Sequence, residues 1–386
     1  MRMASAAAVA RDTKPRVDSV DTARFIGIFF VYWGHITEQI MYLHNDIAAA
    51  QYKYIYSFHM PVFFVLSGLI ARDWGARMRP AQFIASRLAS RFVPLLAFNL
   101  ALGLVSLWST PDFPPIPLQT AADYGHAIVM TLTRLPVFDI PTWFLLCLIS
   151  VEAIHYAVYR FLRGSEARLL LAVLAFYLAG YFLNLRFDFF AAGTNYWLWN
   201  EAITAYAFYL VGVFLQGRGW LQLSAPRMMM WLGAVIAFAL VYLTYDLNRG
   251  PFRLIPAVVI LAAGHGHIFW FPVTALIGSA GILLLAKALP GWRWLPYMGK
   301  NALILMGLNG VVYHQVNTKL AHWFIAHAAP DAAAVTGFCL AVSIVSLVIT
   351  VPLVMLLNRY LPQLVGKPTE RGPLLPALLA ASIVRN

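Results

Sequence analysis

The sequence predicts an all-α fold, a polytopic transmembrane helix bundle of about ten spans. Hydrophobic residues make up 61% of the 386 residues and charged residues only 11%, whereas soluble domains contain about 25% charged residues. The mean hydropathy is +0.70. The apolar residues form runs of about 20, which is the length of helix that crosses a bilayer. Together these observations indicate a multi-pass membrane protein.

The basic residues predict how the chain is oriented. The net charge is +12, but lysines and arginines fall in short clusters between the apolar runs rather than in one patch. This distribution is typical of the positive-inside rule and predicts membrane lipid, not nucleic acid, as a partner. Clusters precede the first span and follow the last, so both termini are expected in the cytoplasm. The expected parts are a cytoplasmic N-terminal tail (1–18), a transmembrane domain (19–358) and a cytoplasmic C-terminal tail (359–386).

Four spans are expected in the first 160 residues. The first follows the basic residues of the N-terminal tail, and the second ends at Arg72 in a cytoplasmic loop. The segment 109–140 is rich in proline and poor in lysine and arginine, which indicates an external loop. The four spans lie near 20–42, 54–71, 83–108 and 141–159.

Six further spans are expected in the rest of the chain. Lys287 and Lys300 favour the cytoplasmic side, which leaves room for only one span between 251 and 289. Residues 251–270 are therefore interpreted as an outer-face or re-entrant segment. Its His265 and His267 are two residues apart, which does not place them on one helical face, so no metal site is predicted. The six spans lie near 169–185, 200–216, 228–245, 271–289, 301–319 and 334–357.

The stretch 21–38 is an apolar helix with a narrow polar stripe. Arg24 and His35 are eleven residues apart, about 20° past three full turns, so both side chains leave one face about 16 Å apart along the axis. Asp21 and Glu38 flank them, giving an Asp–Arg pair and a His–Glu pair. Charged groups inside a membrane usually face a protein interior or a water-filled cavity. An anchoring arginine and a packed core histidine are the alternative for each residue alone.

The second span contains residues that predict a kink and close packing. Pro61 removes a backbone hydrogen bond within a helix, and Gly68 lets another element approach. Kinking and close packing would explain Pro61, Ser67 and Gly68 without any chemistry, and this is the alternative to a role in the site. His59 is expected near the outer end of the span, at a depth similar to that of His35, and we interpret His59, Ser67 and Asp21 as supporting residues of a site around the stripe.

Arg87 and Arg91 lie one helical turn apart at the expected cytoplasmic end of the third span. Two arginines on one face can bind phosphates bidentately. Anchoring of the span by snorkelling arginines is the alternative. The sequence contains no motif of a soluble hydrolase, a metalloprotease or a nucleotide-binding fold.

Several of these motifs resemble a known family, the membrane acyltransferase-3 proteins. The resemblance begins with Asp21-x-x-Arg24, with Arg24-x10-His35 and with the segment 58–68, FHMPVFFVLSG. The fucose 4-O-acetylase and exopolysaccharide O-acetyltransferase branch is the most similar. The chain departs from the family pattern at Ala302 and Asn309, where many relatives have a serine and, a few residues on, a histidine. Further similar segments are 87–94, 143–145, 299–301 and 361–366.

The resemblance implies an acyltransferase of ten helices that takes an acyl group from cytosolic acyl-CoA. The group is delivered to a carbohydrate hydroxyl on the far side of the membrane. Acetyl-CoA is then the expected co-substrate, with succinyl-CoA as the alternative, and Arg24, Arg87 and Arg91 are expected at its phosphates. His35 is expected to act as general base, with Glu38 fixing its tautomer. Transfer through an acyl-histidine is the mechanistic alternative.

The expected acceptor is an extracytoplasmic or lipid-linked saccharide, and the expected location is a bacterial inner membrane. Polysaccharide-assembly proteins are the expected protein partners, and no metal cofactor is predicted. Two other classes of function stay open. In a transporter or flippase, Arg24 and His35 would line a substrate or proton path. A non-catalytic subunit of an export complex would tolerate replacement of His35.

Overall fold

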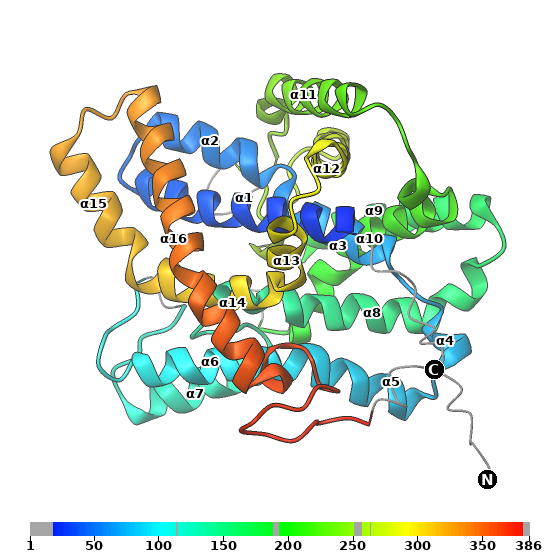
Figure 1. Ribbon diagram of the computed structural model, residues 1–386, viewed down its shortest axis with the longest axis horizontal. Coiled ribbons are helices and arrows are strands. Elements are labelled where there is room, and N and C mark those ends of the chain that lie inside the picture. The colour runs from blue at the N-terminus through cyan, green and yellow to red at the C-terminus, as the bar shows by residue number, and fades with distance from the viewer. Residues whose placement is uncertain (1–17, 113–114, 188–192, 251–256, 263, 381–386) are drawn as a thin grey trace, which may run out of the picture.

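The computed structural model describes residues 18–112, 115–187, 193–250, 257–262 and 264–380. Within these ranges the regular structure is helical, apart from one isolated antiparallel bridge between Val259 and Gly264. The predicted all-α class is therefore confirmed (Figure 1).

The described residues of the first half of the chain form eight α-helices. A π-helical turn, Leu88–Phe92, joins α5 to α6, and a 3₁₀ turn, Ile140–Thr142, precedes α8. The eight helices are α1 (Asp18–Tyr42), α2 (Asp46–Tyr56), α3 (His59–Leu69), α4 (Trp74–Arg77), α5 (Pro80–Arg87), α6 (Val93–Val105), α7 (Ala121–Thr133) and α8 (Trp143–Leu162).

The second half continues with eight more helices among the described residues. A 3₁₀ turn, Tyr196–Leu198, precedes α10, and another, Pro362–Val365, follows α16. The helices are α9 (Glu166–Arg186), α10 (Trp199–Gly217), α11 (Arg227–Thr244), α12 (Trp270–Ala288), α13 (Trp294–Lys300), α14 (Ala302–Gln315), α15 (Asn317–His327) and α16 (Ala332–Tyr360).

Eight helical segments of the described chain are long and apolar enough to cross a membrane, so the polytopic bundle is confirmed. They correspond to all the expected spans except the first and the ninth. The first is α1, which carries five Asp, Glu, Arg or His residues from Asp18 to Glu38. The ninth is divided at Val316 into α14 and α15. The eight segments are Asp46–Ala76, Pro80–Val105, Ile140–Leu162, Glu166–Arg186, Tyr196–Gly217, Arg227–Leu247, Trp270–Ala288 and Ala332–Tyr360.

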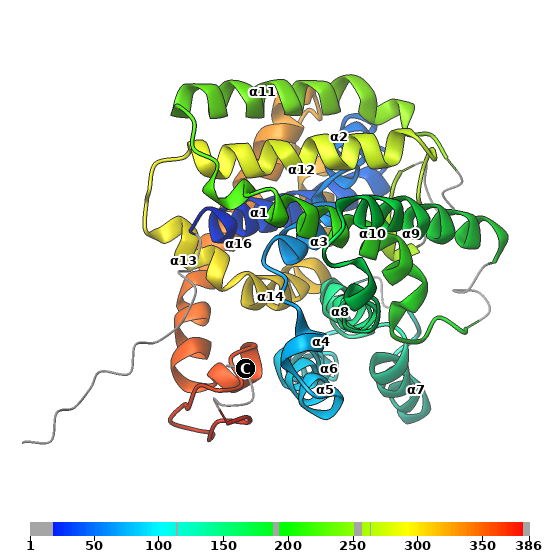
Figure 2. The same ribbon diagram turned by 90° about the vertical axis from the view of Figure 1, so that its right-hand side faces the viewer.

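Helix α1 lies in the middle of the bundle. Figures 1 and 2 both show it between α11 and α12 on one side and α8 with α6 on the other. Most of its residues are buried, including Ala23, Ile36 and Ile40, which have no exposed surface. A helix with charged residues is thus enclosed by the protein, as the cost of charge in a bilayer requires. The helices that contact α1 are α2, α3, α12, α13, α14, α15 and α16.

Two backbone crossings at glycine fix the helices around the site. A Cβ at Gly299, at the end of α13, would overlap the carbonyl oxygen of Asp21 on α1. A Cβ at Gly68 on α3 would overlap the carbonyl oxygen of Tyr209 on α10, and Gly212 meets Val65 in the same way. The close approach predicted at Gly68 is therefore observed. Glycine permits such contacts because it has no side chain.

The second expected span is broken, but not by Pro61. Helix α2 ends at Tyr56, and α3 begins at His59, with Ser57 and Phe58 between them. Pro61 lies in the first turn of α3, where a helix has no bonding partner for a backbone N–H in any case. The predicted kink at Pro61 is therefore replaced by a break three to four residues earlier, and this break places His59 at the start of α3.

The two expected non-spanning segments differ in structure. The external loop expected at 109–140 contains α7, which opens with a capping box between Thr120 and Asp123. Residues 251–256 and 263 of the other segment lie outside the described residues. The rest of it is mostly irregular, with one short 3₁₀ turn at Ile260–Ala262. Irregular backbone at membrane depth is tolerated where it lines a cavity or is buried in protein.

Candidate active site

The polar stripe of α1 faces a single cavity of about 410 Å³. The stripe residues that line it follow one face of the helix at spacings of three and four residues. Arg24 and His35 thus open into the same space, as their spacing predicts. The α1 residues on the cavity are Arg24, Ile28, Val31, His35 and Glu38.

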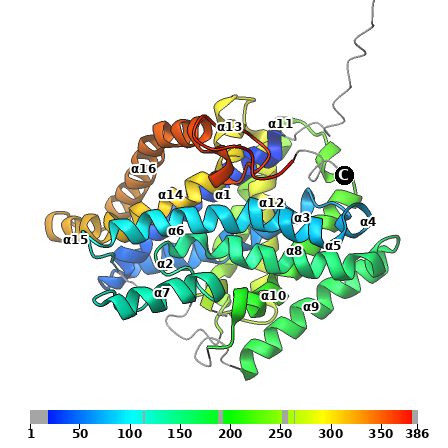
Figure 3. The ribbon, with the colours of Figure 1, turned by 90° about the horizontal axis from the view of Figure 1, so that it is seen from below.

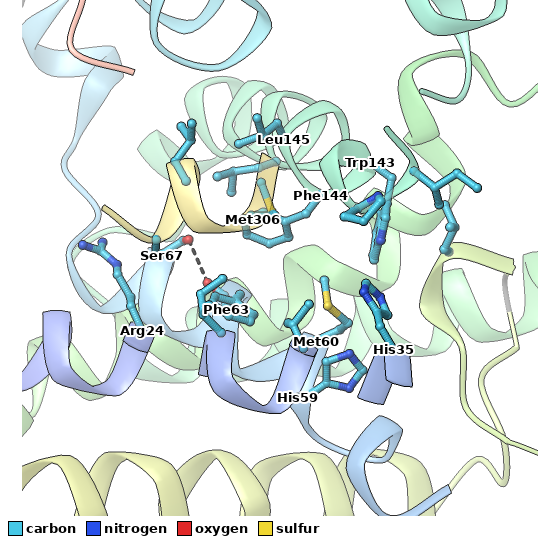
Figure 4. Close-up of a pocket in the computed structure, with 18 of the residues that line it drawn as sticks. Arg24, His35, His59, Met60, Phe63, Ser67, Trp143, Phe144, Leu145 and Met306 are labelled. Atoms are coloured by element: carbon cyan, nitrogen blue, oxygen red, sulfur yellow. Dashed lines mark hydrogen bonds between the residues drawn. The ribbon is translucent and has the colours of Figure 1, made fainter. Parts of the chain in front are cut away.

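The cavity is polar at both ends and mainly apolar between them. Figure 4 shows Arg24 at one end and His35 with His59 at the other. The hydroxyl of Ser67 donates to the carbonyl of Phe63 at 2.7 Å, so it is engaged within its own helix. A cavity with polar ends and an apolar middle suits a ligand with a charged head and a long, uncharged arm. The side chains that Figure 4 labels between the two ends are Met60, Phe63, Phe144, Leu145 and Met306.

His35 is held by a residue that spacing within α1 does not reveal. Its Nδ1 lies 2.5 Å from Oδ1 of Asn309 on α14. Because a carbonyl oxygen can only accept, Nδ1 carries the proton and donates it, and the lone pair is at Nε2. The ring also packs against Tyr313, with centroids 4.6 Å apart. His35 is therefore oriented with an unprotonated nitrogen at the cavity.

Glu38 has tyrosine partners. Its Oε1 accepts from the Tyr42 hydroxyl at 3.1 Å, and its Oε2 accepts from Tyr56 at 3.5 Å. Glu38 was predicted to fix the tautomer of His35. In the structure Asn309 makes the contact that does so. The departure from the family pattern at Asn309 was the one sequence signal that could have identified this contact.

The same end of the cavity carries further polar aromatic groups. Tyr52, Tyr56 and Tyr313 all line it, and the first two stack with ring centroids 3.8 Å apart. His59 lines it as well, and its Nδ1 donates to the carbonyl of Ile55 at 3.1 Å. This end therefore presents hydroxyl groups, aromatic faces and a second imidazole around His35.

At the opposite end, Arg24 is held by the predicted partner. Its Nη1 lies 2.8 Å from Oδ1 of Asp21, one turn earlier on α1. The Asp21 side chain is only 2% exposed, whereas 23% of the Arg24 side chain is exposed. Asp21 thus holds a guanidinium that lines the cavity.

Arg87 and Arg91 share one partner but differ in exposure. Both contact Oε1 of Glu152 on α8, at 3.1 and 3.3 Å, so the predicted common face is observed. Arg87 is buried, lies over the Trp74 ring at 4.6 Å, and is not among the residues that line the cavity. Arg91 lines the cavity and is partly exposed. Arg87 therefore stands behind Arg91, with Glu152 between them.

Two lysines complete the basic end of the cavity. Lys300, at the end of α13, and Lys367, beyond α16, both line it beside Arg24 and Arg91. Lys300 was expected only on the cytoplasmic side, and no role was predicted for Lys367, because neither lysine is close to the stripe along the chain. Because α13 crosses α1 where Gly299 meets Asp21, Lys300 and Arg24 lie at the same end of the cavity.

A buried carboxyl group, that of Asp139, lies near the His35 end of the cavity. Asp139 has no exposed surface, and neither of its carboxyl oxygens has a hydrogen-bond partner among the described residues. Burial raises the pKa of this group well above its usual value. Its backbone N–H donates to Oδ1 of Asn99 at 3.0 Å. This anchor fixes the start of the turn whose Ile140 and Pro141 line the cavity.

Comparison with known families agrees with the geometry. A family model described as an acyltransferase domain, the acyltransferase-3 family, matches residues 17–357. Searches of curated proteins and of solved structures returned no match. The matched range includes Arg24, His35, Arg91 and Asn309, and it ends before Lys367.

Proposed function

This chain belongs to the acyltransferase-3 family and is a multi-pass membrane acyltransferase, and from that premise we propose its donor, acceptor and mechanism. The donor is cytosolic acetyl-CoA, and the acceptor is a hydroxyl of an extracytoplasmic or lipid-linked saccharide, in a bacterial inner membrane. The observation that carries the proposal is the cavity that Arg24 and His35 share on one face of α1.

The basic end of the cavity suits the nucleotide part of the donor. Arg24 and Arg91 offer planar guanidinium groups, which bind phosphate through two parallel hydrogen bonds. Arg87 does not contact the donor itself; through its contact with Glu152 it places a positive charge behind Arg91. The pantetheine arm then follows the apolar middle of the cavity, and the thioester reaches His35, about 16 Å further along α1.

The opposite end suits a saccharide. Aromatic faces and side chains that hydrogen-bond hydroxyl groups are suited to sugar rings, and Tyr52, Tyr56 and Tyr313 supply both kinds of contact beside Glu38. The expected similarity to the fucose and exopolysaccharide branch agrees with this acceptor class. The acceptor enters from the end opposite to the donor nucleotide, so the two substrates meet at His35.

The chemistry follows from the tautomer of His35. Nε2 takes the proton of the acceptor hydroxyl as its oxygen attacks the thioester carbonyl. The carbon–sulfur bond then breaks, and the leaving thiolate takes the proton from Nε2. Asn309 keeps Nδ1 protonated throughout, so the same nitrogen accepts and returns the proton. Transfer through an acetyl group on Nε2 is the alternative, and it would leave a labelled protein when acceptor is withheld.

The test is acyl transfer by purified protein in detergent with acetyl-CoA labelled in the acetyl group. We expect label to pass to saccharide acceptors, or to water when acceptor is absent, and free CoA to accumulate in step. A transporter or flippase would leave the thioester intact. Intact acetyl-CoA, with binding and transport of saccharide in reconstituted vesicles, would therefore contradict the proposal.

A further inference from the structure

Residues 361–380, which follow α16, form an ordered element of the structure. The 3₁₀ turn Pro362–Val365 contacts α6, α16 and the π-helical turn at Leu88–Phe92. Gln363 has no exposed surface, and its side-chain amide donates to the carbonyl of Leu375. The backbone N–H of Leu378 donates to Pro368 at 2.8 Å. In Figures 1 and 3 this segment, coloured red, turns back from the end of α16 toward the bundle.

One side of this segment forms part of the cavity wall. Val365, Gly366, Lys367 and Glu370 line the cavity at the same end as Arg24 and Arg91. Gly366 has a φ of +90°, and a Cβ there would lie 2.9 Å from Cδ1 of Leu303. A glycine is therefore needed for the chain to turn this close to α14. These residues lie beyond the 17–357 range of the family match.

A chain of amide contacts ties Lys367 to the rest of the basic end. The Lys367 ammonium donates to Oδ1 of Asn358, and Nδ2 of Asn358 donates to Oδ1 of Asn301 at 2.8 Å. Asn301 directly follows Lys300, whose Nζ lies 3.9 Å from Oδ1 of Asp18. Lys367 is thus positioned through α16 and the end of α13 next to the crossing that fixes Arg24.

We propose that residues 361–379 form one wall of the donor site and that Lys367 binds a phosphate of the donor nucleotide. A lysine ammonium is a compact point charge, and phosphate is a common ligand for it. The proposal rests on the proposed function, because it assumes a phosphate-bearing thioester as donor. It places Lys367 in binding only, since the thioester reacts at the far end of the cavity.

The test compares two donors that carry the same thioester. Acetyl-CoA has nucleotide phosphates, whereas acetyl-pantetheine has none. Lys367→Gln should raise the KM for acetyl-CoA about 10–100-fold, the range for a hydrogen bond to a charged group, and leave both kinetic constants for acetyl-pantetheine unchanged. Lys367→Arg should retain most of the affinity.

Two neighbours in the same segment serve as matched variants. Arg371 is exposed and does not line the cavity, so Arg371→Gln should leave the KM for acetyl-CoA unchanged although it removes the same charge. Glu370 lines the cavity, and Glu370→Gln should lower that KM because it removes a carboxylate that repels phosphate. An equal effect of Lys367→Gln and Arg371→Gln would show that only net charge matters and would overturn the inference.

Direct titration of CoA into the purified variants gives a second readout that needs no turnover. Weaker CoA binding in Lys367→Gln but not in Arg371→Gln supports the inference. CoA binding and KM at wild-type levels in Lys367→Gln overturn it, while transfer by the wild-type protein shows that the proposed function still holds. If the wild-type protein neither binds CoA nor transfers, the proposed function and this inference fall together.

Discussion

The imidazole of His35 on α1 donates from Nδ1 to the side-chain oxygen of Asn309 on α14, a residue 274 positions later in the chain. This contact selects the tautomer with its lone pair at Nε2, on the side of the cavity. A general base needs its free nitrogen at the substrate, so the contact decides whether His35 can accept a proton from an acceptor hydroxyl.

Replacement of Asn309 should therefore lower the rate without abolishing donor binding. In Asn309→Leu the new side chain has a similar size but cannot accept a hydrogen bond from Nδ1–H, so kcat should fall. The fall should not exceed the contribution of general-base catalysis, about 10²–10⁴-fold. Asn309→Asp keeps an acceptor oxygen and should retain most of the activity. Steady-state kinetics with labelled acetyl-CoA measure both. Equal losses in the two variants would show that the acceptor oxygen is not what matters at this position.

Replacement of Arg91 should weaken donor binding, whereas replacement of Arg87 should lower the stability of the protein. Arg91→Gln removes a guanidinium at the cavity and should raise the KM for acetyl-CoA with little change in kcat, because a contact far from the thioester is largely uniform binding. Arg87→Gln instead removes a buried partner of Glu152, a change that typically costs about 3–5 kcal/mol of stability. Thermal unfolding in detergent, beside the kinetics, distinguishes the two.

The opposite pattern, with Arg87→Gln raising KM at unchanged stability, would place Arg87 at the donor. The double variant Arg87→Gln/Glu152→Gln is the control. It removes the carboxylate that Arg87→Gln leaves with a single partner, so part of the lost stability should return.

The crossing of α3 and α10 should not accept a side chain at Gly68. A methyl group there overlaps the carbonyl oxygen of Tyr209, so Gly68→Ala must push the helices apart. Overpacking of this kind costs about 1–3 kcal/mol. Gly337→Ala on α16 is the matched control, because a Cβ there has no atom within 4 Å. We expect a lower Tm for Gly68→Ala only. An unchanged Tm in both variants would show that α3 and α10 are not in contact at this glycine.

Asp139 should make stability depend on pH. Its pKa in the folded protein is raised above the unfolded value, so the folded state keeps a proton that the unfolded state loses as the pH rises above about 4. The contribution of Asp139 is therefore most favourable at low pH and declines as the pH rises toward the folded pKa. Asp139→Asn imitates the neutral carboxyl and removes this decline.

The measurement is the difference in Tm between Asp139→Asn and the wild-type protein at several pH values between 5 and 8. Comparing the two proteins at each pH cancels the titration of all groups that they share. The Tm of Asp139→Asn minus that of the wild-type protein should increase with pH. A difference that stays constant over the range would show that Asp139 does not carry a raised pKa.

Much of the architecture could be predicted because it depends on composition and on spacing within single helices. The apolar runs predicted the bundle, and the eleven-residue interval predicted that Arg24 and His35 share a face. The break before His59 was not predicted, because it arises between Tyr56 and His59, where no proline or glycine marks it. The expected kink was assigned to Pro61, the nearest residue with a known effect on helices.

The missing parts of the site depend on contacts between distant segments. Four-residue spacing predicts that Arg87 and Arg91 share a face, but it does not show that the Trp74 ring packs against Arg87, which is the buried one of the two. The packing of α14 brings Asn309 to His35, and the packing of the segment after α16 brings Lys367 to the cavity. No local sequence pattern indicates these contacts, and Glu38, a neighbour of His35 on the same helix, was therefore the partner predicted for His35.

The central claim is that His35 performs the chemistry at one end of a cavity whose other end binds the donor. The most direct measurement is CoA binding and acetyl transfer by the same preparation of purified His35→Ala protein. The account predicts CoA binding with an unchanged Kd and transfer that is slower by about 10²–10⁴-fold or more. Transfer at the wild-type rate by a folded His35→Ala protein would contradict it.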